Sequence, residues 1–379
     1  MHDRQEGDLY PLQLSMAPKD RVWGGSRLAR MVRAGPSAGQ RIGEVWSIWD
    51  ELTVQNGVFR GRILADLVRS HPLPLLGSRI ASLSTPLSAS LRGLSSDQPP
   101  LFPLLVKLID AQDTLSVQVH PDDDYARRTE GQAFGKAELW VVLDAEPGAR
   151  LIHGVKRPIS RSDAQEAIWA GAFQDMLEYV DVAAGDVIFN PPGTIHALGS
   201  GLLVYELQQS SDLTYRLYDW NRNDPNRELH VQKALDVANL VPVANHTIEP
   251  VAIQEPGATR TFLCACGRFA AEMLRVDSQV VERPSGFCFH ILTILQGIGA
   301  VQPNLGSARG LLVSAGESVL VPAGIHQYSI QAEDNPLVVI KSYVPDLLQD
   351  VVQPLRERGV ADAKILQLGV NATTSGLAL

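Results

Sequence analysis

Three polar side chains on one strand face are the first residues in this sequence that suggest chemistry. In residues 114–120, apolar side chains alternate with Ser116, Gln118 and His120. Side chains in a strand point alternately to opposite faces, so the apolar residues pack on a core and the polar residues share the other face. An amide oxygen and an imidazole held side by side in this way are suited to binding a metal ion.

Two further candidate ligands follow at later strands. Glu138 begins an apolar strand, and His196 follows the turn Asn-Pro-Pro-Gly-Thr. Together with Gln118 and His120 they offer oxygen and imidazole ligands, for which zinc, manganese, iron and cobalt all fit. A set without thiolates, and with one weak neutral ligand, is typical of a catalytic site. Taken singly, a histidine before a proline fits a turn and a glutamate fits a salt bridge, but their joint placement on successive strands favours a metal.

The elements that must position these residues are mainly strands. Short runs rich in Val, Ile and Leu are separated by Gly, Pro and Asp, which predicts an antiparallel sandwich or barrel. Helices are predicted at four segments, 63–71, 162–177, 229–239 and 346–359. Ser162 and Gln165 form a capping-box pattern at the start of the second. The Ser- and Pro-rich stretch 82–103 predicts a long surface connection.

An internal repeat predicts the architecture. The segments AGDVIFNPPGTIHA and AGESVLVPAGIHQY begin at Ala184 and Ala315, and the strands before them, from Glu138 and His290, also align. This pattern resembles a cupin, a small jelly-roll barrel. The sequence therefore predicts a mainly β protein of two cupin-type jelly-roll barrels with a few short helices around them. The expected domains are a metal-containing catalytic domain (1–245), a second, vestigial barrel (246–345) and a C-terminal helix and tail (346–379).

The second copy of the repeat lacks the ligand pattern. No Gln-x-His strand precedes His290, and the turn before His326 is one residue shorter than the turn before His196. A shift of one residue in a strand reverses the face that a side chain meets. We therefore expect no metal in the second barrel. His153 and His230 are interpreted as surface or helix histidines.

Composition limits the class of partner. The formal net charge of −9 argues against a nucleic-acid partner, because phosphate backbones are bound by clustered Lys and Arg. We expect no membrane partner, since no stretch of 18 apolar residues occurs. The three cysteines form neither a disulfide framework nor a zinc-finger spacing, which favours a cytoplasmic location. Both a monomer and a homodimer are compatible with these observations.

Several longer motifs resemble one enzyme family. VKLIDAQDTLSVQVHPDD, GKAELWVVLDAEPGA, NPPGTIHALGSG and ELQQSSDLTYRLYDWNR are similar to segments of the class I mannose-6-phosphate isomerases (phosphomannose isomerases), above all the short bacterial form. With RVWGGSRLARM, IGEVWSIWD and RELHVQKALDVAN, the resemblance covers most of residues 8–240 and extends more loosely to about 345. It implies that mannose 6-phosphate and fructose 6-phosphate are interconverted by proton transfer through a cis-enediol(ate). It also implies that Gln118, His120, Glu138 and His196 hold one Zn²⁺ per chain.

The resemblance assigns roles to six further residues, which are Arg216, Lys136 and Asp212 as catalytic groups and Ser116, Lys107 and Glu44 at the substrate. Each also has a structural interpretation: Lys107 as a strand residue with a buried stem, Asp212 as a turn cap or ion-pair partner, and Arg216 as part of a structural ion pair. Gly135 stands where enteric and fungal relatives have a histidine. A role assigned to that histidine therefore does not transfer, and the identity of the general base stays open.

Two other functions are compatible with a cupin. A cupin that binds a sugar phosphate without turnover would keep the anion-binding groups, and the joint presence of Arg216 and Lys136 with the metal ligands argues against it. A cupin oxygenase would typically hold iron by three histidines and one glutamate, which Gln118 disfavours. The expected partner is thus a small sugar phosphate.

Overall fold

The computed structural model describes residues 9–30, 41–83, 101–222, 224–225, 227–284, 287–303, 310–333 and 336–370 of the 379-residue chain. The chain forms two compact units. We call Pro18–Trp46 together with Leu105–Ile248 the first unit. The second unit comprises Met1–Ala17, Ser47–Leu104 and Glu249–Leu379. Most of the predicted connection 82–103 lies outside the described residues.

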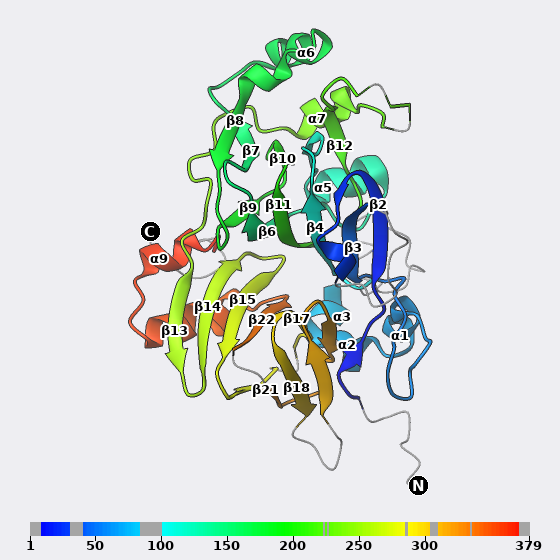
Figure 1. Cartoon of the computed structure of the whole chain (residues 1–379), viewed down its shortest axis with the longest axis vertical. Helices are drawn as coiled ribbons and strands as arrows, with labels where there is room; N and C mark the ends of the chain where they lie inside the picture. Colours follow the sequence, from blue (N-terminus) through cyan, green and yellow to red (C-terminus); the bar gives the residue numbers. More distant parts are fainter. Residues whose placement is uncertain are drawn as a thin grey trace. The chain divides into compact units, whose positions relative to one another are not determined.

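The first unit contains two sheets (Figure 1). The six-stranded sheet has the order β2 (Ala17–Gly25), β3 (Ile42–Ile48), β4 (Leu104–Ala111), β11 (Leu202–Gln209), β6 (Glu138–Ala145) and β9 (Val187–Asn190). The five-stranded sheet has the order β12 (Tyr215–Tyr218), β5 (Val117–Val119), β10 (His196–Leu198), β7 (Arg150–Val155) and β8 (Leu177–Asp181). Trp140 and Ile109 of the first sheet share one apolar cluster with Leu151 and Leu198 of the second. The unit is therefore a β-sandwich.

The second unit repeats this plan. Its seven-stranded sheet has the order β1 (Leu12–Gln13), β20 (Ser318–Val321), β17 (His290–Gln296), β22 (Leu337–Tyr343), β15 (Ala270–Val276), β14 (Ala258–Ala265) and β13 (Val251–Glu255). Its four-stranded sheet has the order β16 (Gln279–Glu282), β21 (Tyr328–Ala332), β18 (Ile298–Pro303) and β19 (Leu311–Ser314). Leu292 and Leu337 of one sheet pack in one cluster with Val301 and Ile330 of the other.

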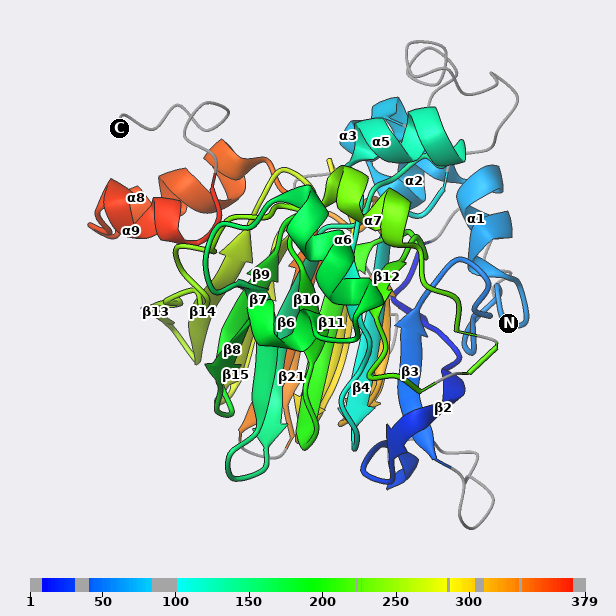
Figure 2. The same cartoon turned by 90° about the horizontal axis from the view of Figure 1, so that it is seen from above.

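Short helices cover the outer side of the five-stranded sheet in the first unit (Figure 2). They are α6 (Arg161–Trp169) and α7 (Val231–Val237), while α5 (Asp123–Tyr125) and a π-helical turn (Ala126–Glu130) follow β5. The predicted helix 162–177 is wrong in its bounds. Ser160, not Ser162, caps α6 by accepting from the Asp163 amide, and a 3₁₀ turn (Phe173–Met176) follows Gly171, whose φ of 70° ends the helix.

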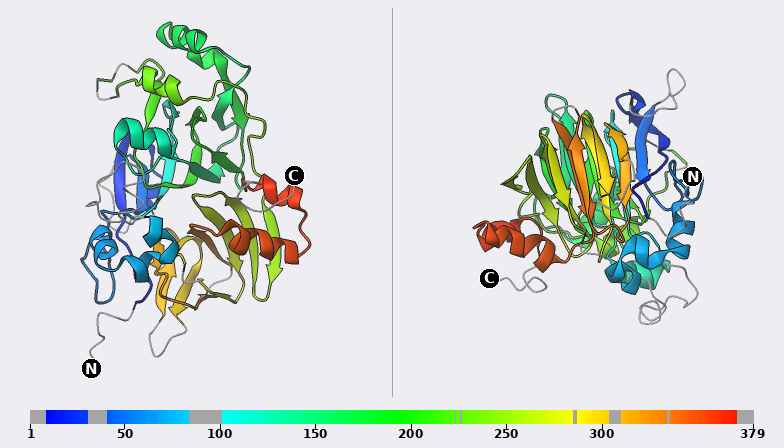
Figure 3. Two further views of the ribbon diagram at one scale, coloured as in Figure 1. Left: turned by 180° about the vertical axis from the view of Figure 1, so that it is seen from behind. Right: turned by 90° about the horizontal axis from the view of Figure 1, so that it is seen from below.

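The helices of the second unit come from two of its sequence segments, Ser47–Leu104 and Glu249–Leu379. They are α1 (Leu64–Ser70), α2 (Pro72–Leu76), α3 (Ser78–Leu83), α8 (Gln353–Glu357) and α9 (Asp362–Gln367), and a π-helical segment (Leu347–Val352) precedes α8. In the first unit, a 3₁₀ turn covers Leu28–Arg30. Figure 3 shows the red C-terminal helices beside the edge of the β13–β14 sheet, where the Ala265 amide donates to the Leu368 carbonyl at 2.8 Å. Pro354 is tolerated inside the predicted helix 346–359 because it stands in the first turn of α8, where its missing N–H is not needed.

The prediction of a mainly β fold with a few short helices is confirmed. Closure of each sandwich into a jelly-roll barrel and the expected domain bounds stay predictions. None of the helices in the described residues is both long and apolar enough to cross a membrane.

Candidate active site

Strand register brings the predicted metal ligands together. His196, the first residue of β10, lies directly opposite Gln118 of β5. Glu138 is the first residue of β6 in the facing sheet, where it lies opposite Gln208 of β11. The two sheets of the sandwich thus present an amide, a carboxylate and an imidazole to the same interior space, and His120 joins them one residue after β5 ends.

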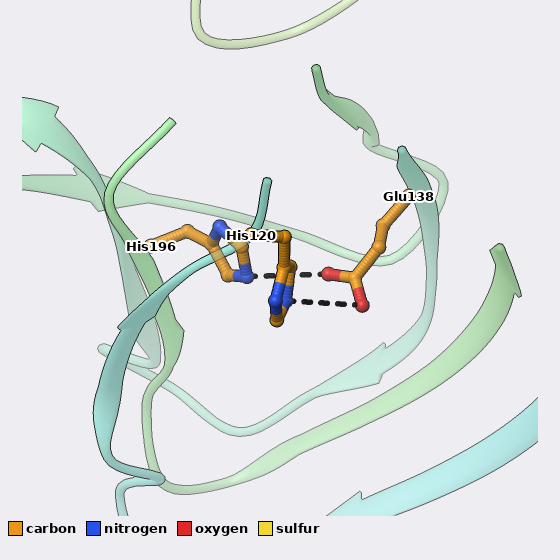
Figure 4. A group of neighbouring side chains, drawn as sticks. All are labelled: His120, Glu138 and His196. Carbon is orange, nitrogen blue, oxygen red and sulfur yellow. Dashed lines mark ion pairs between the residues drawn. The ribbon is translucent and has the colours of Figure 1, made fainter. Parts of the chain in front are cut away.

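Three of these side chains form a tight cluster (Figure 4). The Nε2 atom of His120 lies 3.3 Å from Oε1 of Glu138, and Nε2 of His196 lies 3.2 Å from Oε2. The terminal amide of Gln118 comes within 3.5 Å of the same His196 nitrogen. The cluster is fully inside the protein, because Glu138 is 0% exposed and each histidine 1%.

The second nitrogen of each histidine is fixed by the backbone. Nδ1 of His120 lies 2.9 Å from the Leu213 carbonyl oxygen, and Nδ1 of His196 lies 2.9 Å from the Thr194 carbonyl oxygen. Each Nδ1–H therefore donates to a carbonyl and leaves a lone pair on Nε2, directed at Glu138. Burial, assisted by the charge of Lys136, lowers the pKa of His120 to about 3, so its imidazole is neutral.

Glu138 carries the negative charge of the cluster. Burial alone would raise the pKa of this carboxyl, but the charge of Lys136 holds it well below its ordinary value. The Lys136 ammonium lies 2.9 Å from Oε1. An ionised carboxylate that faces the Nε2 atoms of two imidazoles provides the ligand atoms that a divalent metal requires.

The cluster also has unused ligand atoms. Nε2 of His120 and Oε2 of Glu138 are buried without a hydrogen-bond partner, and Oε1 of Glu138 has only its ion pair with Lys136. Buried polar atoms in proteins are nearly always hydrogen-bonded, so such atoms call for a further partner. Donor atoms that lie within 4.8 Å of one another and converge on one space fit a metal ion.

A cavity of about 370 Å³ opens beside this cluster, within the first unit. Its walls contain all the residues that the sequence placed at the substrate or in catalysis, which are Glu44, Lys107, Ser116, Lys136, Asp212 and Arg216. Gln118 and Glu138 also line it. Two of the four predicted metal ligands therefore line the same cavity as the predicted substrate groups, and His120 and His196 contact one of them, Glu138.

Arg216 presents a cation without a carboxylate partner. Its Nε donates to the Ser116 hydroxyl at 3.1 Å and one terminal nitrogen donates to the Glu228 carbonyl at 2.9 Å. No ion pair joins Arg216 to Asp212, or to any other carboxylate of the described residues. Burial and the nearby Arg227 lower the pKa of Arg216 below its ordinary value, which indicates a charge that is not fully compensated.

The two lysines that line the cavity, Lys107 and Lys136, each form an ion pair with a glutamate that also lines it. Lys107 donates to Glu206 at 2.9 Å and to Gln208 at 2.6 Å, and its side chain is buried. Glu206 also accepts from the Trp140 indole at 2.8 Å. Although burial opposes it, the charge of Glu206 raises the pKa of Lys107, so the ammonium is permanently charged and held in place.

Glu44 and Asp212 differ in their surroundings. Glu44 is bound by Arg21, at 3.0 and 3.2 Å, and by the Trp46 indole at 2.7 Å. Burial would raise the pKa of Glu44, but Lys107 and Arg21 keep it below its ordinary value. Asp212 is exposed at the edge of the cavity and is free of hydrogen bonds to other described side chains.

Gly135 has no room for a side chain. A Cβ at this position would lie 2.5 Å from the Pro121 carbonyl oxygen, closer than atoms approach without a shift. The neighbouring Lys136 amide donates to that same carbonyl at 3.0 Å. The histidine of enteric and fungal relatives would therefore displace the backbone that follows His120.

Some residues of the site were missed or misplaced by the sequence analysis. Arg21, Glu206 and Arg227 line the cavity but were not singled out from the sequence. Each is the first residue of a quoted family motif, RVWGGSRLARM, ELQQSSDLTYRLYDWNR or RELHVQKALDVAN, and these motifs were the available signal. The surface interpretation of His153 is wrong: this residue is 1% exposed, lies opposite His196 in β7 and has an unpartnered Nε2. Its position in the apolar run LIHGV, between Leu151 and Val155, was the available signal.

Comparison with known proteins gives one consistent family. Residues 10–145 match the family model described as phosphomannose isomerase type I, catalytic domain. A mannose-6-phosphate isomerase of Bacillus subtilis is 31% identical over 85% of this chain and 96% of its own length. A mannose-6-phosphate isomerase of Streptococcus mutans is 32% identical over 88% of this chain and 98% of its own length.

Solved structures agree with the sequence comparisons. The crystal structure of mannose 6-phosphate isomerase from Bacillus subtilis matches with a TM-score of 0.73 at 28% identity, covering 88% of this chain and 99% of that chain. A phosphomannose isomerase variant from Salmonella typhimurium matches with a TM-score of 0.66 at 13% identity, covering 88% and 99%. The second likeness bears on the fold alone.

Proposed function

Because the chain belongs to the type I mannose-6-phosphate isomerase family, we propose that the cavity of the first unit is where it interconverts mannose 6-phosphate and fructose 6-phosphate. The enzyme is metal-dependent, as its family is, and the His120–Glu138–His196 group is its candidate metal site. The residue roles that follow belong to this proposal, as do the identity of the metal, a cytoplasmic location and a monomeric or dimeric state.

We assign the metal as one Zn²⁺ held by His120, Glu138, His196 and the amide oxygen of Gln118. Two imidazoles, one carboxylate and one amide oxygen would provide four ligands without thiolates, a set that suits zinc. A zinc ion bound there would act as a Lewis acid on the oxygens at C1 and C2 of the sugar. The backbone carbonyls of Leu213 and Thr194 hold the two imidazoles in the orientation that the ion needs.

Arg216 is the proposed anchor for the phosphate. It is the cation of the cavity that lacks a carboxylate partner, whereas Lys107 is neutralised by Glu206 and Arg227 by Asp219 at 2.6 Å. A guanidinium offers two parallel donors to a phosphate, and Ser116 fixes its orientation through Nε. Ser116 and Arg216 together would therefore set the end of the cavity at which the phosphate lies.

The remaining charged groups serve proton transfer and positioning. Asp212 and Lys136 are the proposed catalytic groups, one exposed at the cavity edge and one beside Glu138. An aldose becomes a ketose when a proton leaves C2 and returns at C1, through a cis-enediol(ate), while the hydroxyl proton moves from O2 to O1. Lys107 and Glu44 are held rigidly by their partners, so they would orient sugar hydroxyl groups without themselves moving.

One observation supports this proposal most directly: the buried His120–Glu138–His196 cluster, with unpartnered ligand atoms, opens into the cavity that contains the uncompensated Arg216. The test is a coupled isomerase assay with mannose 6-phosphate, run with metal analysis before and after chelation. We expect turnover that is lost on chelation and restored by Zn²⁺. Binding of mannose 6-phosphate without any turnover in the metal-loaded protein would contradict the proposal, and loss of activity under strict exclusion of oxygen would indicate an oxygenase.

A further inference from the structure

The second unit has a cavity of its own, of about 430 Å³, which the isomerase reaction does not use. It lies in the sandwich that is expected to carry no metal. Its walls are charged rather than apolar, and they include Arg260, Glu272, Glu282, His290 and Lys341. We call this space the second cavity.

An ion-pair network lies at the bottom of the second cavity. Lys341 is 2.9 Å from Glu272 and 2.8 Å from Glu282. Arg260 forms ion pairs with these two carboxylates and with Glu255, the last at 3.0 Å. These side chains are buried, Glu272 and Glu282 at 2% and 5% exposed. A buried network of this kind is not required for stability, since well-packed apolar residues of similar volume are commonly as stable or more so.

The network repeats the active site with its charges reversed. In the first unit, Arg21 of β2 pairs with Glu44 of β3 at 3.0 Å, and in the second unit Glu255 of β13 pairs with Arg260 of β14 at 3.0 Å. These strands hold the same places in the two sheet orders. The second cavity therefore stands where the substrate cavity stands in the first unit.

The next strand pair follows the same rule. Lys107 of β4 pairs with Glu206 of β11 at 2.9 Å, and Glu272 of β15 pairs with Lys341 of β22 at 2.9 Å. Both cavities are therefore lined by ion pairs. At each of these strand positions, a cation in one unit corresponds to a carboxylate in the other. Charged positions that only filled a core would have no reason to be retained as pairs at corresponding strands.

The positions equivalent to the candidate metal ligands carry other residues in the second unit. Tyr328 lies opposite Glu282 where His196 lies opposite Gln118, and its hydroxyl is 2.9 Å from Nδ1 of His290. His326 is exposed, as the shorter turn predicts. The cations of Arg260 and Lys341 already lie between the carboxylates, so a metal ion would meet repulsion there.

The balance of charge indicates which ligand the second cavity would accept. Cationic and carboxylate groups line it in equal number. At its bottom, three carboxylates face two cations, which disfavours a phosphate. Burial lowers the pKa of His290 to about 3, so its imidazole is neutral, and its Nε2 has no hydrogen-bond partner in the described part of the chain. Phe262 and Tyr343 add aromatic surfaces.

A neutral hydroxyl-bearing molecule meets all of these conditions. Each hydroxyl group can donate to a carboxylate and accept from an ammonium or guanidinium, so it fits between paired charges without changing their balance. C–H groups of the same molecule can lie against the aromatic rings. We propose that the second cavity is a binding site for a neutral polyhydroxylated molecule of hexose or hexitol size, separate from the isomerase site.

The test uses D-sorbitol with the metal-loaded full-length protein, followed by saturation-transfer NMR. Sorbitol has no carbonyl group, so the isomerase reaction does not consume it. We expect binding that saturating mannose 6-phosphate does not displace. Displacement by mannose 6-phosphate would place sorbitol in the active site and overturn the proposal, and so would the absence of binding to a protein that shows isomerase activity.

Matched variants locate the site. Gln349 is exposed and lines the second cavity, so Gln349→Trp should fill its opening and raise the dissociation constant for sorbitol at least about tenfold. Leu348→Trp, at the neighbouring exposed position outside the lining, should leave binding unchanged. His290→Asn, which keeps a polar group near Tyr328 but removes Nε2, should also weaken binding. Isomerase activity should be unaffected in all three. Equal sorbitol affinity in Gln349→Trp and Leu348→Trp would overturn the proposal.

Discussion

The ammonium of Lys136 lies 2.9 Å from the same Glu138 oxygen that His120 approaches at 3.3 Å. Lys136 keeps the buried carboxylate ionised, and its own side chain is buried at 3% exposed. A candidate catalytic group and a candidate metal ligand are therefore in direct contact. Any change at Glu138 is expected to affect both metal binding and the position of Lys136.

Removing a strong ligand should remove the metal. We expect His120→Ala, Glu138→Ala and His196→Ala to lose bound metal and turnover, because each deletes a charged or imidazole donor. Gln118→Ala should be milder, because a neutral amide oxygen is the weakest donor of the set. Elemental analysis per chain measures this, and His326→Ala, at an exposed histidine of the second unit, is the control. Near-normal metal content in His196→Ala would show that the ligand assignment is wrong.

Removing the Arg216 guanidinium should weaken phosphate recognition. Hydrogen bonds to charged groups contribute about 1.5–3 kcal/mol, so Arg216→Ala should lower kcat/KM for mannose 6-phosphate about 10- to 150-fold. Arg216→Lys should recover only part of the loss, because a point charge cannot reproduce the guanidinium fork. Unphosphorylated mannose is the internal control, and its slow turnover should change little. An equal penalty with both sugars would show that Arg216 acts elsewhere.

Much of the site follows from local sequence rules. The two-residue period of a strand places Gln118 on the interior face, and the repeat indicates both sandwiches and the loss of ligands in the second. What local rules could not supply is long-range pairing. Leu12 pairs with Leu320, so the first residues of the described chain belong to the second unit. Nothing near Leu12 in the sequence specifies a partner so far away.

The ion pairs that line the cavity of the first unit also could not be predicted from local sequence. Glu206 neutralises Lys107, which excludes Lys107 as the free phosphate anchor, but the two are far apart in sequence and carry no common motif. The start of the predicted helix 162–177 was wrong for a local reason. Ser160 and Ser162 are both plausible N-caps, and only the backbone shows that Ser160 accepts from Asp163.

A side chain at position 135 should disturb the site. Gly135→Ala would place a Cβ against the Pro121 carbonyl, and such overpacking typically costs about 1–3 kcal/mol of unfolding free energy. We expect a lower melting temperature and weaker metal retention, because Pro121 follows His120. Gly267→Ala is the matched control, since a Cβ there has nothing within 4 Å. Unchanged stability and metal content in Gly135→Ala would contradict this account of the missing histidine.

Acid should loosen the second unit through His290. Burial and Lys341 lower its folded pKa to about 3, against 6.5 ordinarily, while Glu282, Glu272 and Arg260 face it from neighbouring strands. Below about pH 6.5 the unfolded chain gains a proton that the folded chain does not. The stabilisation of the folded state by neutral His290 is therefore complete above about pH 6.5. It is lost as the pH falls towards 3, by on the order of 1 kcal/mol of unfolding free energy per pH unit. Hydrogen exchange of β17 and β22 peptides measures it. His290→Asn should show a shallower pH dependence, and an identical slope would contradict the assignment.

The final prediction concerns the base at Asp212. If this carboxylate takes the C2 proton and returns it at C1, turnover in deuterated water should place some solvent deuterium in fructose 6-phosphate, the more so because Asp212 is exposed and its proton can exchange. Asp212→Asn keeps the shape but removes the base. It should retain metal and substrate binding and lose at least about a hundredfold in turnover, the lower range for general-base catalysis. Near-normal turnover in that variant would shift the role to Lys136, which is already beside Glu138. A complete absence of deuterium in the product would instead favour direct hydride transfer between C2 and C1, for which no base at the carbon is needed and only the hydroxyl proton moves from O2 to O1.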